Sequence, residues 1–219
     1  MNLSGYKSIV FDCDGVVLNS NQVKTQAFYN VTLGYGEGFA RKFRDFHMQN
    51  GGISRYKKFE YFLTNIIGKK IDEEVLNNLL YSFSKEVKKG LMSCEITKNL
   101  DILRQETTGA NWSIVSGGDQ EELREVFKAR GISDYFNGGI FGSPSCKDTI
   151  LANELRNKNL IHPCLFLGDS KYDYEVSVRH RLDFVFISGW SEVYNHQDYC
   201  RVNKIKSKES VIDLLDCTN

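Results

Sequence analysis

Short apolar runs, each about the length of one strand, recur along this chain. They are nearly free of polar residues, as is typical of parallel strands whose faces are both covered by helices. These runs are Ser8–Asp12, Trp112–Ser116, Gly139–Gly142, Cys164–Gly168 and Asp183–Ile187. Amphipathic stretches separate the later runs, and one of them begins at Asp119 and stops before Gly131. This alternation predicts an α/β fold with a doubly wound parallel sheet.

A long stretch near the N-terminus lacks any strand pattern and shows only amphipathic helices. Aromatic residues repeat there at helical spacing, which predicts the core of a helical bundle. The clearest repeat is Phe39, Phe43 and Phe46. The last helix is expected to start at Asp72 and to end at Gly90. We therefore expect an inserted α-helical domain at residues 19–90 and an α/β core formed by residues 1–18 and 91–219.

Charge and composition narrow the classes of function. Lysine plus arginine number 28, as do aspartate plus glutamate, so the formal net charge is zero. We therefore expect no broad nucleic-acid or membrane surface driven by charge. The apolar runs are too short to span a bilayer, and the first residues lack the layout of a signal peptide. No oligomeric state is predicted.

The cysteines and histidines show no metal-binding spacing. The chain has six scattered cysteines without a C-x-x-C pair, so we expect reduced thiols in a cytoplasmic protein. They are Cys13, Cys94, Cys146, Cys164, Cys200 and Cys217. Strand alternation should turn Cys13 into the core. The four histidines are also isolated, which argues against a zinc site.

The most informative polar residues are Asp12 and Asp14, which directly follow the apolar stretch Ile9-Val10-Phe11. Because side chains alternate along a strand, two acids one residue apart point off the same sheet edge. Gly15 then allows a sharp turn that brings backbone close to whatever the acids hold. Two carboxylates at the carboxyl end of a parallel strand suit a divalent metal or a displacement reaction better than they suit stability.

Polar groups also follow three later runs. Ser116 and Gly117 come after the second run, where a hydroxyl and free backbone N–H groups suit an anion. Lys147 follows the third run and can neutralise a phosphate. Asp169 and Asp173 follow the fourth run and offer the oxygen ligands that Mg²⁺ prefers. Each cluster alone fits an ordinary turn or cap, but their order at successive strand ends favours one site.

This order of motifs resembles the haloacid dehalogenase superfamily, and in particular its phosphoglycolate phosphatase and β-phosphoglucomutase-like subfamily. The matching motifs are Asp12-Cys13-Asp14-Gly15-Val16, Ser116, Lys147 and Gly168-Asp169-Ser170-Lys171-Tyr172-Asp173. The helical insertion after the first motif is similar to the cap domain of this family. The resemblance implies a Mg²⁺-dependent phosphatase that acts on small phosphorylated metabolites, such as phosphoglycolate or a sugar phosphate.

The resemblance also implies a role for each residue of the core site. Asp12 would be the nucleophile that forms an aspartyl phosphate. Asp14 would protonate the leaving oxygen and then deprotonate the attacking water. Mg²⁺ would bind the Asp12 carboxylate, the Asp14 backbone carbonyl and Asp169, while Asp173 orders its water shell or binds it directly. Ser116 and Lys147 would help to neutralise the phosphoryl oxygens, as charge-stabilised phosphoryl transfer requires.

Two alternatives accompany this interpretation. A phosphomutase of the β-phosphoglucomutase type uses the same core, but that group resembles a pattern with histidine where this chain has Lys24. A phosphoaspartate receiver domain also gathers acids, a hydroxyl and a lysine around Mg²⁺, yet it signals rather than turns over substrate. The spacing of Asp12 and Asp14 and the helical insertion argue against a receiver.

The segment Gly51-Gly52-Ile53-Ser54-Arg55 resembles the substrate-specificity loop of capped members of the family. Its glycines permit a loop that reaches into the site, and Arg55 offers a fork for a carboxylate or a second phosphate. Ser54 and Arg55 are therefore candidate substrate-binding residues, together with Gly117. The alternative is that Ser54 caps the following helix while Arg55 points to solvent.

Overall fold

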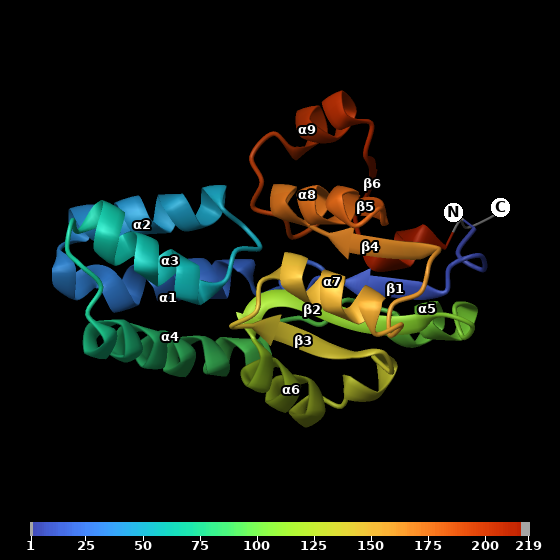
Figure 1. Cartoon of the computed structure of the whole chain (residues 1–219), viewed down its shortest axis with the longest axis horizontal. Coiled ribbons are helices and arrows are strands. Elements are labelled where there is room, and N and C mark those ends of the chain that lie inside the picture. Colours follow the sequence, from blue (N-terminus) through green and yellow to red (C-terminus); the bar gives the residue numbers. More distant parts are fainter. Residues whose placement is uncertain (1, 216–219) are drawn as a thin grey trace.

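The computed structural model describes residues 2–215 of the chain. At its centre lies a six-stranded parallel sheet with the order β3-β2-β1-β4-β5-β6 (Figure 1). The strands are β1 (Ser8–Phe11), β2 (Asn111–Asp119), β3 (Gly139–Ser143), β4 (Cys164–Gly168), β5 (Asp183–Ile187) and β6 (Lys206–Lys208). The predicted α/β sheet is confirmed. The edge strand β6 was not among the predicted strands, because its short polar sequence carries no apolar signal.

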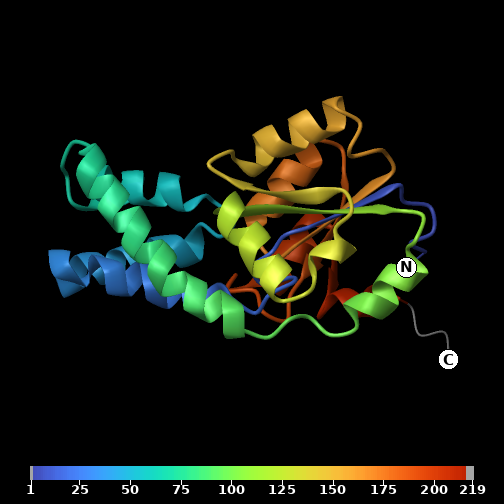
Figure 2. The same ribbon diagram turned by 90° about the horizontal axis from the view of Figure 1, so that it is seen from below.

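Helices cover both faces of the sheet because successive strand residues point to opposite faces. Ile9 and Phe11 of β1 belong to one apolar cluster, which includes side chains from α5 and α6. Val10 belongs to the other, which includes side chains from α7 and α8. Figure 2 shows these two helical layers with the sheet between them. The core helices are α5 (Leu100–Glu106), α6 (Gln120–Ala129), α7 (Lys147–Arg156), α8 (Lys171–Arg179) and α9 (His196–Asn203), with short turns η3 (Ser133–Tyr135) and η4 (Val211–Leu214).

The helical insertion, α1 to α4, stands at the carboxyl ends of the strands (Figure 1). Its elements are α1 (Asn21–Thr32), η1 (Leu33–Tyr35), α2 (Glu37–Gln49), α3 (Arg55–Tyr61), the π-helical turn η2 (Phe62–Ile66) and α4 (Glu73–Ser93). Its core is aromatic, with the ring of Phe28 centred 4.1 Å from that of Phe83 and 5.3 Å from that of Phe43. These rings belong to the same apolar cluster as Ile9 and Phe11 of β1, so the insertion and the sheet share one core.

The start of α4 is as predicted, but its end is not. Asp72 caps the helix by accepting hydrogen bonds from the N–H groups of Glu74 and Val75, at 2.9 and 3.3 Å. The helix does not stop at Gly90 but continues to Ser93. Gly90 instead lies where α4 crosses α1, and a Cβ atom there would collide with Val23. This glycine therefore permits close helix packing rather than terminating the helix.

The chain passes between the insertion and the sheet twice, and the two passages are hydrogen bonded to each other. The N–H of Asn19 donates to the carbonyl of Glu95 at 2.9 Å, and the N–H of Thr97 donates to the carbonyl of Val17 at 2.8 Å. Leu18 and the second passage form an antiparallel bridge between these bonds. The insertion is thus attached through two adjacent, paired segments.

Five of the six cysteines lie in the described residues. Cys13, Cys94, Cys146, Cys164 and Cys200 are free thiols. Cys13 is buried in the apolar cluster that contains Ile9 and Phe11, as strand alternation predicts. Cys217 lies outside the described residues. Within residues 2–215, no helix combines the length and the apolar character needed to cross a bilayer.

The contact between Gly90 and Val23 leads to a stability prediction. Gly90→Ala should lower the free energy of unfolding by about 1–3 kcal/mol, because the stiff Val23 side chain leaves no room for a methyl group. Gly38→Ala in α2 is the matched control, since a Cβ there meets no atom within 4 Å. That change should leave stability unaltered or raise it by up to about 1 kcal/mol. Urea denaturation of both variants tests this, and equal gains would contradict the packing argument.

Candidate active site

Three buried carboxylates meet at the carboxyl ends of β1 and β4. These strands are neighbours, and Phe11 pairs with Leu167, so the residues that follow each strand lie side by side. Asp12 follows β1, Asp169 follows β4, and Asp173 lies in the first turn of α8. Each offers an oxygen within 4.8 Å of oxygens from the other two. Such a set of hard oxygen donors fits a divalent cation.

Lys147, the first residue of α7, balances part of this negative charge. Its fully buried Nζ lies 2.9 Å from Oδ1 of Asp12 and 2.5 Å from Oδ1 of Asp173. Against burial, which lowers it, the two carboxylates raise the pKa of Lys147, so the ammonium stays charged. Burial raises the pKa of Asp12 to about 7, although Lys147 opposes the rise. Burial and the charge of Asp12 also raise the pKa of Asp169, so one lysine leaves the cluster short of positive charge.

Two polar side chains hold the carboxylates in position. Ser170 and Asp173 form a capping box at the start of α8, in which the hydroxyl of Ser170 donates to Oδ2 of Asp173 at 2.6 Å. The amide of Asn21 donates to Oδ2 of Asp169 at 2.7 Å and to the carbonyl of Trp190 at 2.8 Å. The spacing of Ser170 and Asp173 could have revealed the box in the sequence. Asn21 carries no such signal because its partners are distant along the chain.

Asp14 is oriented toward the helical insertion rather than into the carboxylate cluster. Gly15 has a φ of 77° and makes the sharp turn that the sequence predicts. The carboxylate of Asp14 accepts a hydrogen bond from the hydroxyl of Ser20 at 2.6 Å and pairs with Nζ of Lys24 at 2.5 Å. Against burial, which raises it, Lys24 and Ser20 lower the pKa of Asp14. Asp14 is thus held as an anion next to a lysine of α1.

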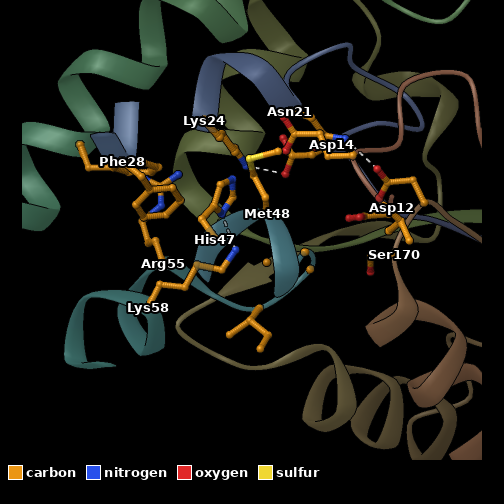
Figure 3. A pocket seen from close by; sticks show the side chains of 18 residues that line it. Asp12, Asp14, Asn21, Lys24, Phe28, His47, Met48, Arg55, Lys58 and Ser170 are labelled. Carbon is orange, nitrogen blue, oxygen red and sulfur yellow. Dashed lines mark hydrogen bonds and ion pairs between the residues drawn. The ribbon is translucent and has the colours of Figure 1, made fainter. Parts of the chain in front are cut away.

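The insertion closes the site from the side opposite the sheet. A cavity of about 50 Å³ lies between them (Figure 3). Four candidate site residues of the core line it, and so does one from the insertion. They are Asp12, Asp14, Gly117, Asp169 and Arg55. The loop residues Gly51, Gly52 and Ile53 form part of the wall, so this loop does reach the site.

The remaining candidate residues lie behind this wall. Lys147 and Asp173 reach the cavity only through their contacts with Asp12 and with each other. Ser116 is buried, and its hydroxyl accepts a hydrogen bond from the N–H of Gly118 at 3.0 Å. Ser54 is also buried, at the N-cap position of α3. Its hydroxyl makes no cap hydrogen bond and has no partner among the described residues.

Arg55 lines the cavity, but its guanidinium is already bound by Glu122 of α6. Nη2 lies 2.5 Å from Oε1 and Nη1 lies 3.2 Å from Oε2, a bidentate pair with exposed side-chain fractions of 4% and 5%. The guanidinium also lies 4.7 Å from the ring centre of Phe83. Arg55 therefore points neither to solvent nor to an open anion site. It joins the insertion to the core.

Other polar contacts link the same elements. The hydroxyl of Ser84 on α4 donates to Oε2 of Glu122 at 2.6 Å, and the hydroxyl of Tyr56 donates to Asp119 at 2.9 Å. Lys88 and Glu125 form an exposed ion pair across the same junction at 2.6 Å. Glu122 thus accepts from two helices of the insertion. This role of Glu122 could not be predicted from the sequence, because its partners lie 67 and 38 residues away.

Two further cavity residues, His47 and Lys58, were not singled out in the sequence. Both are buried in the insertion, and Nζ of Lys58 lies 2.6 Å from Nδ1 of His47 (Figure 3). Lys58 follows Arg55 by one helical turn, so it shares the cavity-facing side of α3. That i, i+3 spacing after the loop was the available sequence signal.

Comparisons with known proteins agree with this architecture. The chain superimposes on a hydrolase from Pseudomonas syringae with a TM-score of 0.74 at 17% identity, covering 96% of this chain and 97% of that one. It matches a protein from Haemophilus somnus described as a predicted phosphoglycolate phosphatase, with a TM-score of 0.71, 17% identity and coverage of 99% and 100%. It matches β-phosphoglucomutase from Clostridium difficile with a TM-score of 0.71 and 16% identity, covering 95% of this chain and 93% of that one. At these identities the likeness is one of fold.

A search among curated proteins found no match to the chain. A family model for haloacid dehalogenase-like hydrolases matches residues 6–180. The matched segment contains the whole helical insertion and all four sequence motifs, from Asp12 to Asp173. The protein therefore belongs to the haloacid dehalogenase-like hydrolase family.

Proposed function

We propose that the protein is a Mg²⁺-dependent phosphatase that hydrolyses small phosphate monoesters in the cytoplasm. The observation that carries this proposal is the place of Asp12, a carboxylate on the cavity wall with Lys147 at 2.9 Å and Asp14 two residues away. Such hydrolysis needs a nucleophile, a positive charge near the phosphoryl oxygens and a separate group that transfers protons. Membership of a hydrolase family counts against the receiver-domain alternative.

In the proposed reaction, Asp12 attacks phosphorus and the ester oxygen leaves, which gives an aspartyl phosphate. Asp14, in its protonated form, gives its proton to the leaving oxygen and becomes the carboxylate that Lys24 stabilises. It then takes one from the water that attacks the intermediate, so that phosphate is released and Asp12 is restored. Lys147, Ser116 and the backbone N–H near Gly117 neutralise the phosphoryl oxygens.

Free thiols in the described residues support the cytoplasmic setting.

We assign the cation to the carboxylates of Asp12, Asp169 and Asp173 and to the backbone carbonyl of Asp14. When bound, Mg²⁺ would supply positive charge to the phosphoryl oxygens. The excess of carboxylates over the single ammonium of Lys147 supports this assignment. The substrate is a small phosphorylated metabolite, held from the other side by the insertion at residues 19–90, which acts as a cap.

The mutase alternative is weakened by Lys24. In the proposed phosphatase, Lys24 keeps Asp14 ionised and therefore ready to accept a proton from water. The mutase pattern has histidine at this place, so Lys24 departs from it. Ser54 and Gly117 stay candidate substrate contacts, whereas we assign Arg55 to closure of the cap through Glu122.

The nucleophile is tested by Asp12→Asn in a screen of phosphate monoesters with Mg²⁺. The variant should fold but lose turnover on every ester, because an amide is a far weaker nucleophile than a carboxylate. Asp101→Asn, an exposed change on α5, is the control and should retain full activity. Phosphate release assays measure both, and undiminished hydrolysis by Asp12→Asn would disprove the mechanism.

The cation is tested by thermal unfolding with Mg²⁺ or with EDTA. In metal-free protein, the raised pKa of Asp12, about 7, means that stability falls as pH rises from about 4 to about 7. Mg²⁺ should offset this loss, so its stabilising effect should grow over the same range, reaching about 2.7 kcal/mol at 100 times its Kd. Asp169→Asn should remove most of the effect. An equal Mg²⁺ effect at pH 5 and pH 8 would contradict the assignment.

The role of Arg55 is tested with two substrates, an ester with a second anionic group and a small aryl phosphate. If Arg55 closes the cap, Arg55→Ala and Glu122→Gln should each lower kcat/KM roughly tenfold or more on both substrates. Lys88→Ala, at the exposed pair across the same junction, should have little effect. A loss confined to the anionic ester, with Glu122→Gln unaffected, would instead make Arg55 a substrate contact.

A further inference from the structure

Lys58 is a buried basic side chain without a counter-anion in the part of the chain that the structure describes. Its exposed fraction is 2%. Among residues 2–215, the one hydrogen bond of its side chain is with Nδ1 of His47, and its Nζ also lies 5.5 Å from the ring centre of Phe28. None of the described carboxylates forms an ion pair with it. Burying a charge is costly unless that charge is paired, so the charged form of Lys58 is favoured when an anion lies beside it.

The other buried cations near the cavity differ from Lys58 in this respect. Lys24 pairs with Asp14, Arg55 pairs with Glu122, and Lys147 pairs with two carboxylates. These pairs show that the fold supplies acids where it buries basic groups. The unpaired Lys58 is therefore an exception that needs its own explanation.

His47 cannot supply the missing negative charge. Burial and the neighbouring Lys58 lower the pKa of His47 well below its usual range, so the ring is neutral. A protonated Lys58 has only donors, so Nδ1 of His47 accepts its hydrogen bond and fixes the direction of the ammonium. The other N–H donors of the ammonium are left for a ligand.

Lys58 lines the same cavity as Asp12 and Asp14 but comes from the opposite wall, with Phe28 and Met48 also lining that side (Figure 3). We propose that Lys58, oriented by His47, binds an anionic group at the end of the substrate remote from the transferred phosphoryl group. This inference rests on the proposed phosphatase function. A short phosphorylated carboxylic acid carries both the ester phosphate and the second anionic group that this arrangement requires.

The charges around Lys58 make the binding of an anion dependent on pH. Burial, assisted by Lys24 and Lys147, lowers the pKa of Lys58 to about 7, against the opposing effects of Asp14 and Glu192. An anion beside Nζ raises that pKa again. Above pH 7, a substrate with a second anionic group should therefore bind with uptake of a proton, and its KM should rise with pH.

The first test compares phosphoglycolate with 2-hydroxyethyl phosphate, which has a neutral end. Lys58→Met should lower kcat/KM for phosphoglycolate by about 10-fold to 100-fold, the loss expected for a charged hydrogen bond, and leave the neutral ester nearly unchanged. Lys57→Met is the matched control, because this neighbouring lysine of α3 is exposed and pairs with Glu60. Lys57→Met should leave kcat/KM unchanged for both substrates. His47→Gln should raise KM for phosphoglycolate and shift its pH profile with little change in kcat.

A structural role for Lys58 predicts a different result. Removal of a buried unpaired charge should leave the Tm of Lys58→Met unchanged or raised. A lower Tm with equal losses on both esters would overturn the proposal and make Lys58 a packing residue. Equal use of both esters by the unaltered enzyme and by Lys58→Met would also overturn it, while leaving the phosphatase function intact.

A binding experiment separates this proposal from the reaction itself. Phosphoglycolate is titrated calorimetrically into Asp12→Asn protein with Mg²⁺ at pH 8, in two buffers of different ionisation enthalpy. The expected result is proton uptake on binding, which disappears when Lys58→Met is added to Asp12→Asn. If the unaltered enzyme hydrolyses no ester but this uptake is seen, the proposed function fails and the anion site stands. Uptake that persists without Lys58 would overturn the anion site.

Discussion

Three carboxylates at one sheet edge repel one another, and the ammonium of Lys147 makes their burial together possible. Its Nζ contacts Asp12 at 2.9 Å and Asp173 at 2.5 Å with no exposure to solvent. The parallel register of β1 and β4 brings the acids together, and the start of α7 supplies the lysine. A buried ionic cluster of this kind adds little net stability, so its presence indicates a chemical purpose.

The main features of the fold were predictable because they depend on local patterns. Unbroken apolar runs identified β1 to β5, and aromatic periodicity identified the helical insertion. The sequence could not reveal β6, an edge strand of two lysines and a serine that pairs, among residues 2–215, with β5 alone. The prediction that Gly90 ends α4 was also wrong. A glycine that ends a helix and a glycine that allows a second helix to pack closely cannot be distinguished from the local sequence.

The structure brings several candidate residues of the core to one sheet edge, whereas the contacts made by the insertion could not be anticipated, for a related reason. Asp12, Lys147 and Asp169 each follow a strand and Ser116 lies near the end of β2, and parallel strands bring their ends to one edge whatever the intervening sequence. The partners of Arg55 and Lys58 depend instead on how α3 packs on other helices. Glu122 is 67 residues from Arg55, so the ion pair between them cannot be predicted from the local sequence.

The paired passages beside Leu18 and Ile96 give the insertion a single pivot. Two adjacent hydrogen-bonded segments resist sliding and permit rotation about their common line. Asp14 precedes this pivot, whereas Lys24 lies beyond it on α1. Any rotation of the insertion about this line would draw Lys24 away from Asp14, so the position of the insertion and the proton affinity of that carboxylate would change together.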